Sequence, residues 1–114
     1  MLNKIEIIRG TTNTFDLSVL DASGNVYTME DYEKIIFGVK QKTTDTDLVI
    51  MKTAKMTNPG VYEFTLNPED TSTLDPGKYV YDVSLESRSN FYNVIEPNPF
   101  IIAPNVTEKG DADK

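Results

Sequence analysis

The chain has 114 residues, of which 39% are hydrophobic, and this size and composition fit one domain with a single core. It has no cysteine and no histidine, which excludes disulfides, thiolate sites and the usual general base at neutral pH. The formal charge of −7, with scattered lysines and arginines, argues against nucleic-acid binding. There is no apolar run of about 18 residues and no secretory signal pattern, so we expect a soluble, uncleaved chain without membrane insertion.

The first half of the chain alternates apolar and polar residues in short segments, which is typical of half-buried strands. A type I turn is expected over residues 21–24, because the turn begins with aspartate and ends with glycine. The polar segment 29–33 is expected to connect two strands, with Asp31 and Glu33 exposed. Phe37 is the predicted central aromatic residue of the core. The expected strands cover residues 4–9, 15–21, 26–28, 34–42 and 48–53.

The middle of the chain supplies one ambiguous strand and one clear strand. Segment 48–53 begins with apolar residues on both faces, which favours a central position in a sheet or a covered face. Segment 61–66 alternates regularly, and its inward residues are expected to be Tyr62, Phe64 and Leu66. Asn67 is the expected cap of a short helix over residues 68–74, because proline and two acidic residues follow it.

The last part of the chain predicts a hairpin followed by an interrupted strand. Residues 86–90 are expected to turn the chain back into a strand over residues 91–96. Pro97 and Pro99 cannot donate ladder hydrogen bonds, so this strand should be broken or lie at an edge before it resumes at residues 100–103.

The most informative segment is the turn and strand over residues 74–85. Its spacing of Asp75, Gly77 and Tyr79 resembles the tyrosine corner that opens strand F of immunoglobulin-like sandwiches. Tyr81 stands where those domains often carry cysteine, and an ordinary hairpin entering a half-buried strand is the alternative interpretation. With the other segments, this corner predicts an all-β fold, an immunoglobulin-like antiparallel β-sandwich of about seven to nine strands.

The expected domain organisation is a single β-sandwich over residues 1–107 and a flexible charged tail over residues 108–114. The tail is nearly devoid of apolar residues and therefore has little to bury.

Few side chains are candidates for chemistry. Asp45 and Asp47 could offer oxygen ligands to calcium, but the spacing of an EF-hand is missing and a solvated loop is the favoured interpretation. Glu69, Asp70 and Asp75 could work as paired carboxylates, although exposed turn carboxylates are much commoner. The plentiful serines and threonines lack a histidine to activate them. We therefore expect no enzyme and assign no catalytic, cofactor-binding or metal-binding residues and no cofactor.

Four segments, spread over roughly residues 5–107, specify turns and core positions. They are Ile7, Ile8, Arg9, Gly10, Thr11 and Thr12 with Phe15 following, Leu20 to Gly24, Leu66 to Leu74, and Pro76 to Val83. Together they resemble small immunoglobulin-like domains encoded in phages and prophages, especially the N-terminal domain of the baseplate upper protein family.

This resemblance implies a noncatalytic structural module of a virion tail or baseplate, assembled in the cytoplasm of a bacterial host. The implied partners are other tail or baseplate subunits or further copies of the chain itself. The alternative is a carbohydrate-binding or adhesion module of a bacterial surface protein, in which exposed rings stack on a glycan. The candidate rings for that alternative are Tyr27, Tyr32 and Tyr92, because Tyr62, Tyr79 and Tyr81 are expected to face inward.

Overall fold

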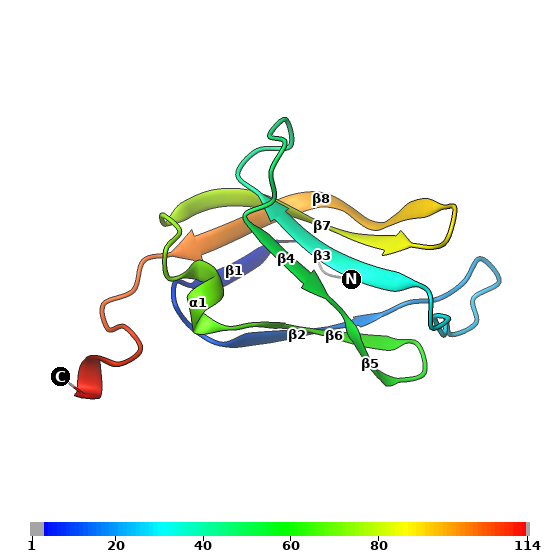
Figure 1. The fold of residues 1–114 in the computed structure, drawn as a ribbon, viewed down its shortest axis with the longest axis horizontal. Coiled ribbons are helices and arrows are strands. Elements are labelled where there is room, and N and C mark those ends of the chain that lie inside the picture. The colour runs from blue at the N-terminus through cyan, green and yellow to red at the C-terminus, as the bar shows by residue number, and fades with distance from the viewer. Residues whose placement is uncertain (1–3, 114) are drawn as a thin grey trace.

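The computed structural model describes residues 4–113, and its regular structure is almost entirely strand (Figure 1). Residues 1–3 of the predicted domain and Lys114 of the predicted tail lie outside the described residues. The helical elements are α1 (Pro68–Thr71) and the 3-10 helix η1 (Asp111–Asp113). The strands are β1 (Ile5–Ile8), β2 (Asn13–Ser18), β3 (Lys34–Lys40), β4 (Ile50–Thr53), β5 (Lys55–Asn58), β6 (Val61–Leu66), β7 (Gly77–Glu86) and β8 (Phe91–Ala103).

The strands form two layered sheets, which confirms the predicted all-β sandwich. One sheet has the order β1-β8-β7-β3-β4 and the other has the order β2-β6-β5. The neighbours β3, β7 and β8 correspond to strands C, F and G of an immunoglobulin-like domain, and β2, β6 and β5 correspond to strands B, E and D. All pairs are antiparallel except β1 with β8, which pair in parallel from Ile5 opposite Phe100.

Phe37 on β3 is the central aromatic residue of the core, as predicted. It is 1% exposed, and its ring centroid lies 5.4–6.4 Å from four other rings. Two of these rings come from the three-stranded sheet and two from the five-stranded sheet; they are Phe15, Phe64, Tyr81 and Phe100. Tyr81 is nearly stacked on Phe37, and the two rings lie on the neighbouring strands β7 and β3 of the five-stranded sheet.

The predicted tyrosine corner is present at the start of β7. The hydroxyl of Tyr79 donates to the backbone oxygen of Asp75 at 2.7 Å. Gly77 has a φ of 147°, a conformation that favours glycine, and it lets the chain turn between these two residues. Burial raises the pKa of the Tyr79 phenol, and the nearby Asp75 carboxylate raises it further.

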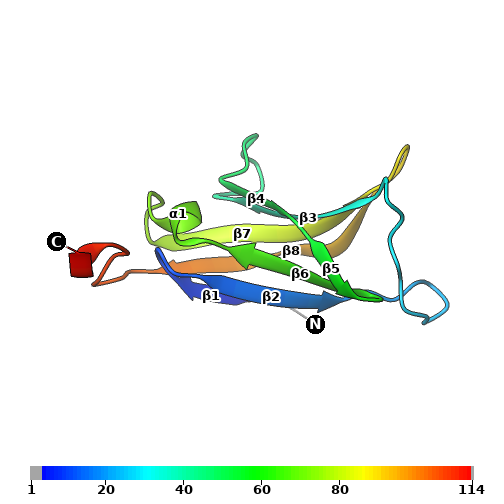
Figure 2. The same cartoon turned by 60° about the horizontal axis from the view of Figure 1, so that its bottom comes forward.

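The prediction that segment 48–53 is central or covered is wrong. Strand β4 begins at Ile50 and forms an edge of the five-stranded sheet, with β3 as its only neighbour there. Leu48, Val49 and Met51 are exposed, so the apolar run marks an uncovered surface and not a buried strand. From β4 the chain passes directly into β5 of the other sheet (Figure 2).

The two prolines lie at an edge, which was one of the two predicted alternatives. Strand β8 is not broken, because it continues from Phe91 to Ala103. Within residues 4–113, its first nine residues have β7 on one side only, since β1 pairs with residues 100–103 alone. Pro97 falls within a register shift against β7, where the ladder is interrupted.

Several shorter predictions can be compared directly with the structure. Asn67 precedes α1 and its backbone N–H donates to the Asp70 carboxylate at 2.6 Å, which confirms the predicted helix start, although α1 ends at Thr71. The hairpin over residues 86–90 is confirmed by a bond from Ser87 N to Asn90 O at 2.8 Å. The turn over residues 21–24 is also present, closed by Gly24 N donating to Asp21 O at 3.0 Å.

Three other features differ from expectation. Residues 26–28 form no strand and contribute only a bridge between Val26 and Leu20. Strand β5 was not predicted, because all four of its residues are exposed and give no alternation. Glu33 was expected to be exposed but is buried, since its carboxylate accepts hydrogen bonds from the Tyr27 hydroxyl at 2.6 Å and the Glu30 N–H at 2.9 Å. In the tail, the Glu108 carboxylate lies 3.4 Å from the Arg9 guanidinium. The flexibility of the tail over residues 108–114 stays a prediction.

The corner hydroxyl can be tested with Tyr79→Phe, which keeps the buried ring and removes the bond to Asp75. We expect the free energy of unfolding to fall by about 1 kcal/mol, because a carbonyl of the corner loses its partner. Urea denaturation measures the change as a lower midpoint. Tyr92→Phe is the matched control, since Tyr92 is exposed. Equal midpoints for Tyr79→Phe and the unmodified chain would contradict a stabilising corner.

Candidate functional site

A groove of about 450 Å³ runs over the outer face of the five-stranded sheet. Because Phe37 and Tyr81 point into the core, their neighbours Gly38 and Asp82 face outward, and the two outward residues lie opposite each other on β3 and β7. Ser84 pairs with Ile36 one step further along the same strands. These four residues form the floor of what we call the sheet groove; its lining is Ile36, Gly38, Lys40, Thr46, Leu48, Met51, Asp82, Ser84, Phe91 and Asn93.

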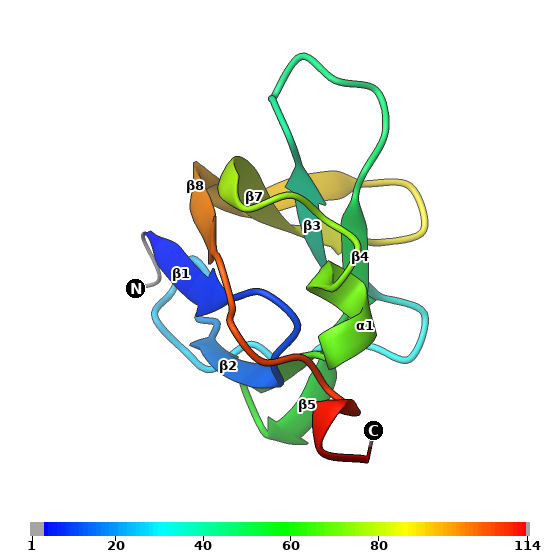
Figure 3. The same ribbon diagram turned by 90° about the vertical axis from the view of Figure 1, so that its left-hand side faces the viewer.

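Gly38 has no side chain, and Leu48 packs over it. A Cβ built there would lie 3.1 Å from Cδ2 of Leu48 and 3.7 Å from Oδ1 of Asp82. Leu48 comes from the loop 41–49 between β3 and β4, which projects away from the sandwich (Figure 3). Glycine inside a strand weakens pairing and often marks a place where another group approaches closely.

The rim of the sheet groove is apolar and accessible. Leu48, Met51 and Phe91 are 45%, 59% and 64% exposed, and they reach the groove from the loop, β4 and β8. Single exposed apolar residues are ordinary, but several around one depression form a surface that favours protein contacts. This clustering makes the sheet groove the candidate functional site.

The polar side chains of the groove are arranged on its floor and at one end. The Nδ2 group of Asn93 donates to Asp82 Oδ2 at 3.2 Å and to Ser84 Oγ at 3.1 Å, which fixes the Asp82 carboxylate against the floor. Lys40 lines the same groove. The ion pairs within residues 4–113 join Lys4 to Glu6, Arg9 to Glu108 and Lys52 to Asp70, so both groove charges are without an ion-pair partner there.

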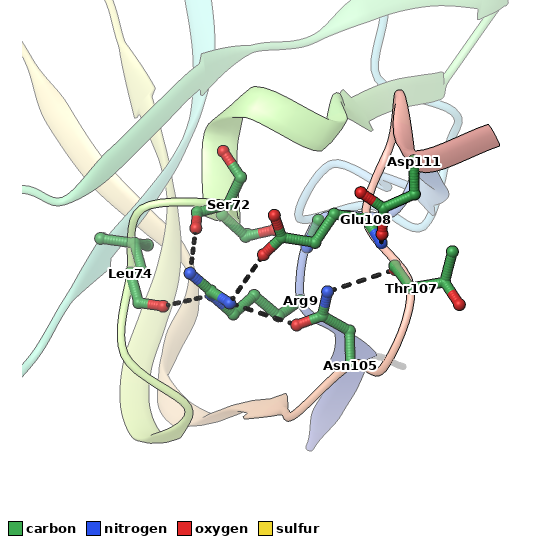
Figure 4. A network of polar contacts seen from close by, with 9 residues as sticks. Arg9, Ser72, Leu74, Asn105, Thr107, Glu108 and Asp111 are labelled. Carbon is green, nitrogen blue, oxygen red and sulfur yellow. Dashed lines mark hydrogen bonds and ion pairs between the residues drawn. The ribbon is translucent and has the colours of Figure 1, made fainter. Parts of the chain in front are cut away.

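A second depression, of about 300 Å³, lies beside Gly10 and α1, but its cation is already engaged. The Arg9 guanidinium donates to the Leu74 carbonyl at 2.9 Å, to the Ser72 carbonyl, and to side-chain oxygens of Asn105 at 3.2 Å and Glu108 at 3.4 Å (Figure 4). Four of its five N–H donors are thereby used within the chain. We therefore infer that this network stabilises the fold. Its hydrogen bonds connect the end of β1 with the tyrosine corner and the C-terminal segment.

Among the five acidic residues singled out in the sequence, the Asp45 and Asp70 carboxylates have structural contacts within the chain. Asp45 closes a turn by accepting from the Lys42 N–H at 3.1 Å, and no group of three or more potential metal ligands occurs within residues 4–113. Asp70 pairs with Lys52 at 2.9 Å as well as capping α1. Asp75 contributes its backbone carbonyl to the tyrosine corner. Asp47 and Glu69 are exposed.

The three tyrosines proposed as a glycan platform have different surroundings. Tyr27 is half-buried and donates to Glu33; burial first, and then that carboxylate, raise the pKa of its phenol. Tyr32 is covered on one side by the Arg88 guanidinium, 4.1 Å from the ring centroid. Tyr92 is 54% exposed on β8. Among the described residues, no ring contact joins any two of them.

Sequence reasoning missed the sheet groove, because no motif encodes it. Its parts come from four strands and a loop, and only the strand register brings Gly38, Asp82 and Met51 side by side. Two signals pointed toward it: a glycine in the middle of a predicted strand, and an apolar run on both faces of segment 48–53.

Comparison with known proteins found no matching family model and no matching curated protein. No helix within the described residues has the length and apolar character needed to cross a membrane.

Arg9→Lys tests whether the Arg9 network stabilises the C-terminal segment. A lysine keeps the charge but cannot serve four acceptors, so we expect a loss of about 2 kcal/mol in the free energy of unfolding and faster trypsin cleavage after Lys109. Mass spectrometry of timed digests measures the cleavage. Arg88→Lys is the control, because Arg88 is exposed in the β7–β8 hairpin. Equal rates of cleavage after Lys109 in both variants would contradict a role for Arg9 in stabilising the C-terminal segment.

Proposed function

We propose that this chain is a noncatalytic structural module of a phage or prophage tail or baseplate, acting through protein-protein contacts. The observation that carries the proposal is the sheet groove, with its exposed apolar rim of Leu48, Met51 and Phe91. An apolar rim around a floor with a few fixed polar groups suits a macromolecular surface that excludes water from the contact.

The virion part of the proposal rests on the resemblance of four segments to baseplate domains. In this chain, residues of those segments make hydrogen bonds that hold the ends of strands together. Arg9 and Gly10 both bond to the region after β6, since the Gly10 N–H donates to the Thr71 hydroxyl at 2.7 Å and Arg9 reaches the Ser72 and Leu74 carbonyls. Shared motifs of this kind support a shared framework, and the assignment to a tail or baseplate extends that likeness to function.

The two sheet edges support contacts on selected surfaces. Pro97 and Pro99 lie on the part of β8 that β1 leaves uncovered. Because proline has no backbone N–H, a strand added there would find fewer hydrogen-bond donors. On the opposite edge, β4 has no such residue and adjoins the sheet groove. This asymmetry directs association toward the β4 side of the five-stranded sheet.

The edge-blocking role can be tested by replacing both prolines, with Pro97→Thr and Pro99→Thr in one chain. We expect species larger than those of the unmodified protein, growing with concentration, because the uncovered part of β8 regains its donors. Sedimentation velocity measures them, and circular dichroism checks folding. Pro104→Thr is the control, as Pro104 is exposed and follows the strand. Sedimentation identical to the unmodified protein at every concentration would show that the prolines block nothing.

The function itself is tested by looking for the chain in virus particles. Particles are purified by density gradient from the source bacterium after prophage induction, and their proteins are quantified by mass spectrometry. The proposal expects the chain in the particles at a fixed ratio to other tail proteins. Recovery only in the cell-wall fraction, together with glycan-array binding that alanine replacements of Tyr27, Tyr32 and Tyr92 abolish, would instead establish the adhesion alternative.

A further inference from the structure

We propose that the sheet groove is a contact between two copies of this chain, related by a twofold axis, in which Lys40 of each copy pairs with Asp82 of the other. The inference rests on the proposed function as a protein-contact module and names the partner of its candidate site.

The two charges are placed as near neighbours on the same face. Lys40 lies opposite Val80, and Gly38 lies opposite Asp82, so Lys40 and Asp82 are diagonal neighbours on adjacent antiparallel strands. Such positions are roughly 7–8 Å apart in a sheet. Both line the sheet groove, and within residues 4–113 neither takes part in an ion pair. The groove therefore carries one cation and one anion that are available to an occupant.

A surface with both signs is complementary to a rotated copy of itself. In a twofold interface, if residue i of one copy contacts residue j of the other, then j also contacts i. An axis midway between Lys40 and Asp82, lying in the plane of the contact, places each of these charges over its opposite and forms two equivalent ion pairs. A partner with a uniformly basic surface would satisfy Asp82 but would repel Lys40.

The apolar rim fits the same arrangement. Leu48, Met51 and Phe91 surround the charges and become buried together with their symmetry mates, which supplies the favourable area that two exposed ion pairs lack. Charge pairs then fix the orientation and apolar contacts contribute affinity.

The net charge of −7 opposes any self-association at long range. At physiological ionic strength the screening length is about 8 Å, so repulsion between distant groups is weakened while the pairs at the contact keep their effect. We expect a reversible dimer in dilute solution, favoured where an assembly holds copies near one another.

The experiment is a charge exchange followed by sedimentation velocity and native mass spectrometry on the full chain. Lys40→Glu alone places two negatively charged residues opposite each other at both pairs of the dimer. Asp82→Lys alone places two positively charged residues opposite each other at both pairs. Each is expected to weaken dimerisation on the order of tenfold or more. Mixing the two variants restores opposite charges at both pairs, so the mixture forms a heterodimer, and K40E/D82K in one chain restores the homodimer.

Matched controls carry the same charge changes on the outer face of the other sheet. Asp16→Lys on β2 and Lys55→Glu on β5 are both exposed and are expected to leave dimerisation unchanged, alone and mixed. Circular dichroism confirms that every variant is folded. If one single variant failed to fold, the test would rest on the other single variant and on the K40E/D82K double variant.

The outcomes separate this inference from the proposed function. A chain that stays monomeric at all concentrations, or a dimer indifferent to charge exchange, overturns the twofold contact. If such a chain is still present in purified particles, the structural function stands and the groove binds a different subunit. A charge-dependent dimer that is absent from particles supports the contact and overturns the virion assignment.

Discussion

The packing of Phe37 between the two sheets is the constraint on which the rest of the structure depends. Its ring contacts Phe15 and Phe64 from one layer and Tyr81 and Phe100 from the other. Because side chains alternate along a strand, fixing Phe37 inward places Ile36 and Gly38 outward, and fixing Tyr81 inward places Asp82 outward. If the register of a strand shifted by one residue, its inward and outward side chains would exchange faces. The position of the sheet groove therefore follows from the packing of the core.

One end of the sandwich depends on a different kind of constraint, the need to satisfy backbone carbonyls between α1 and β7. The carbonyls of Ser72 and Leu74 accept from Arg9, and that of Asp75 accepts from Tyr79. Backbone oxygens removed from water are costly without partners, so an irregular connection of this length needs side-chain donors. Arginine is suited to the first task because its planar group serves several acceptors at once. The corner and the Arg9 network are thus two solutions to one requirement.

Sequence reasoning succeeded where local pattern and burial agree. Phe37 and Tyr62 lie in strands of regular alternation, and Tyr79 lies in a spacing that determines its own hydrogen bond. It failed at β5, where all four residues are exposed and no face is hidden from water. At Glu33 and in segment 48–53, residue polarity gave the wrong burial. The charged Glu33 is buried because it accepts hydrogen bonds, and the apolar residues of segment 48–53 line an open surface.

The sheet groove was beyond prediction because it is a property of register. Gly38 becomes informative only when Asp82 and Met51 are known to flank it on neighbouring strands, and no local pattern states which strands will pair. The same register places Lys40 and Asp82 beside the exposed apolar side chains of the groove rim. In the proposed twofold contact, repulsion acts over the whole surface at a distance, whereas Leu48, Met51 and Phe91 act only at contact, and the charges beside them favour one orientation. In that proposed contact, long-range charge and short-range shape therefore act together to select a specific neighbour.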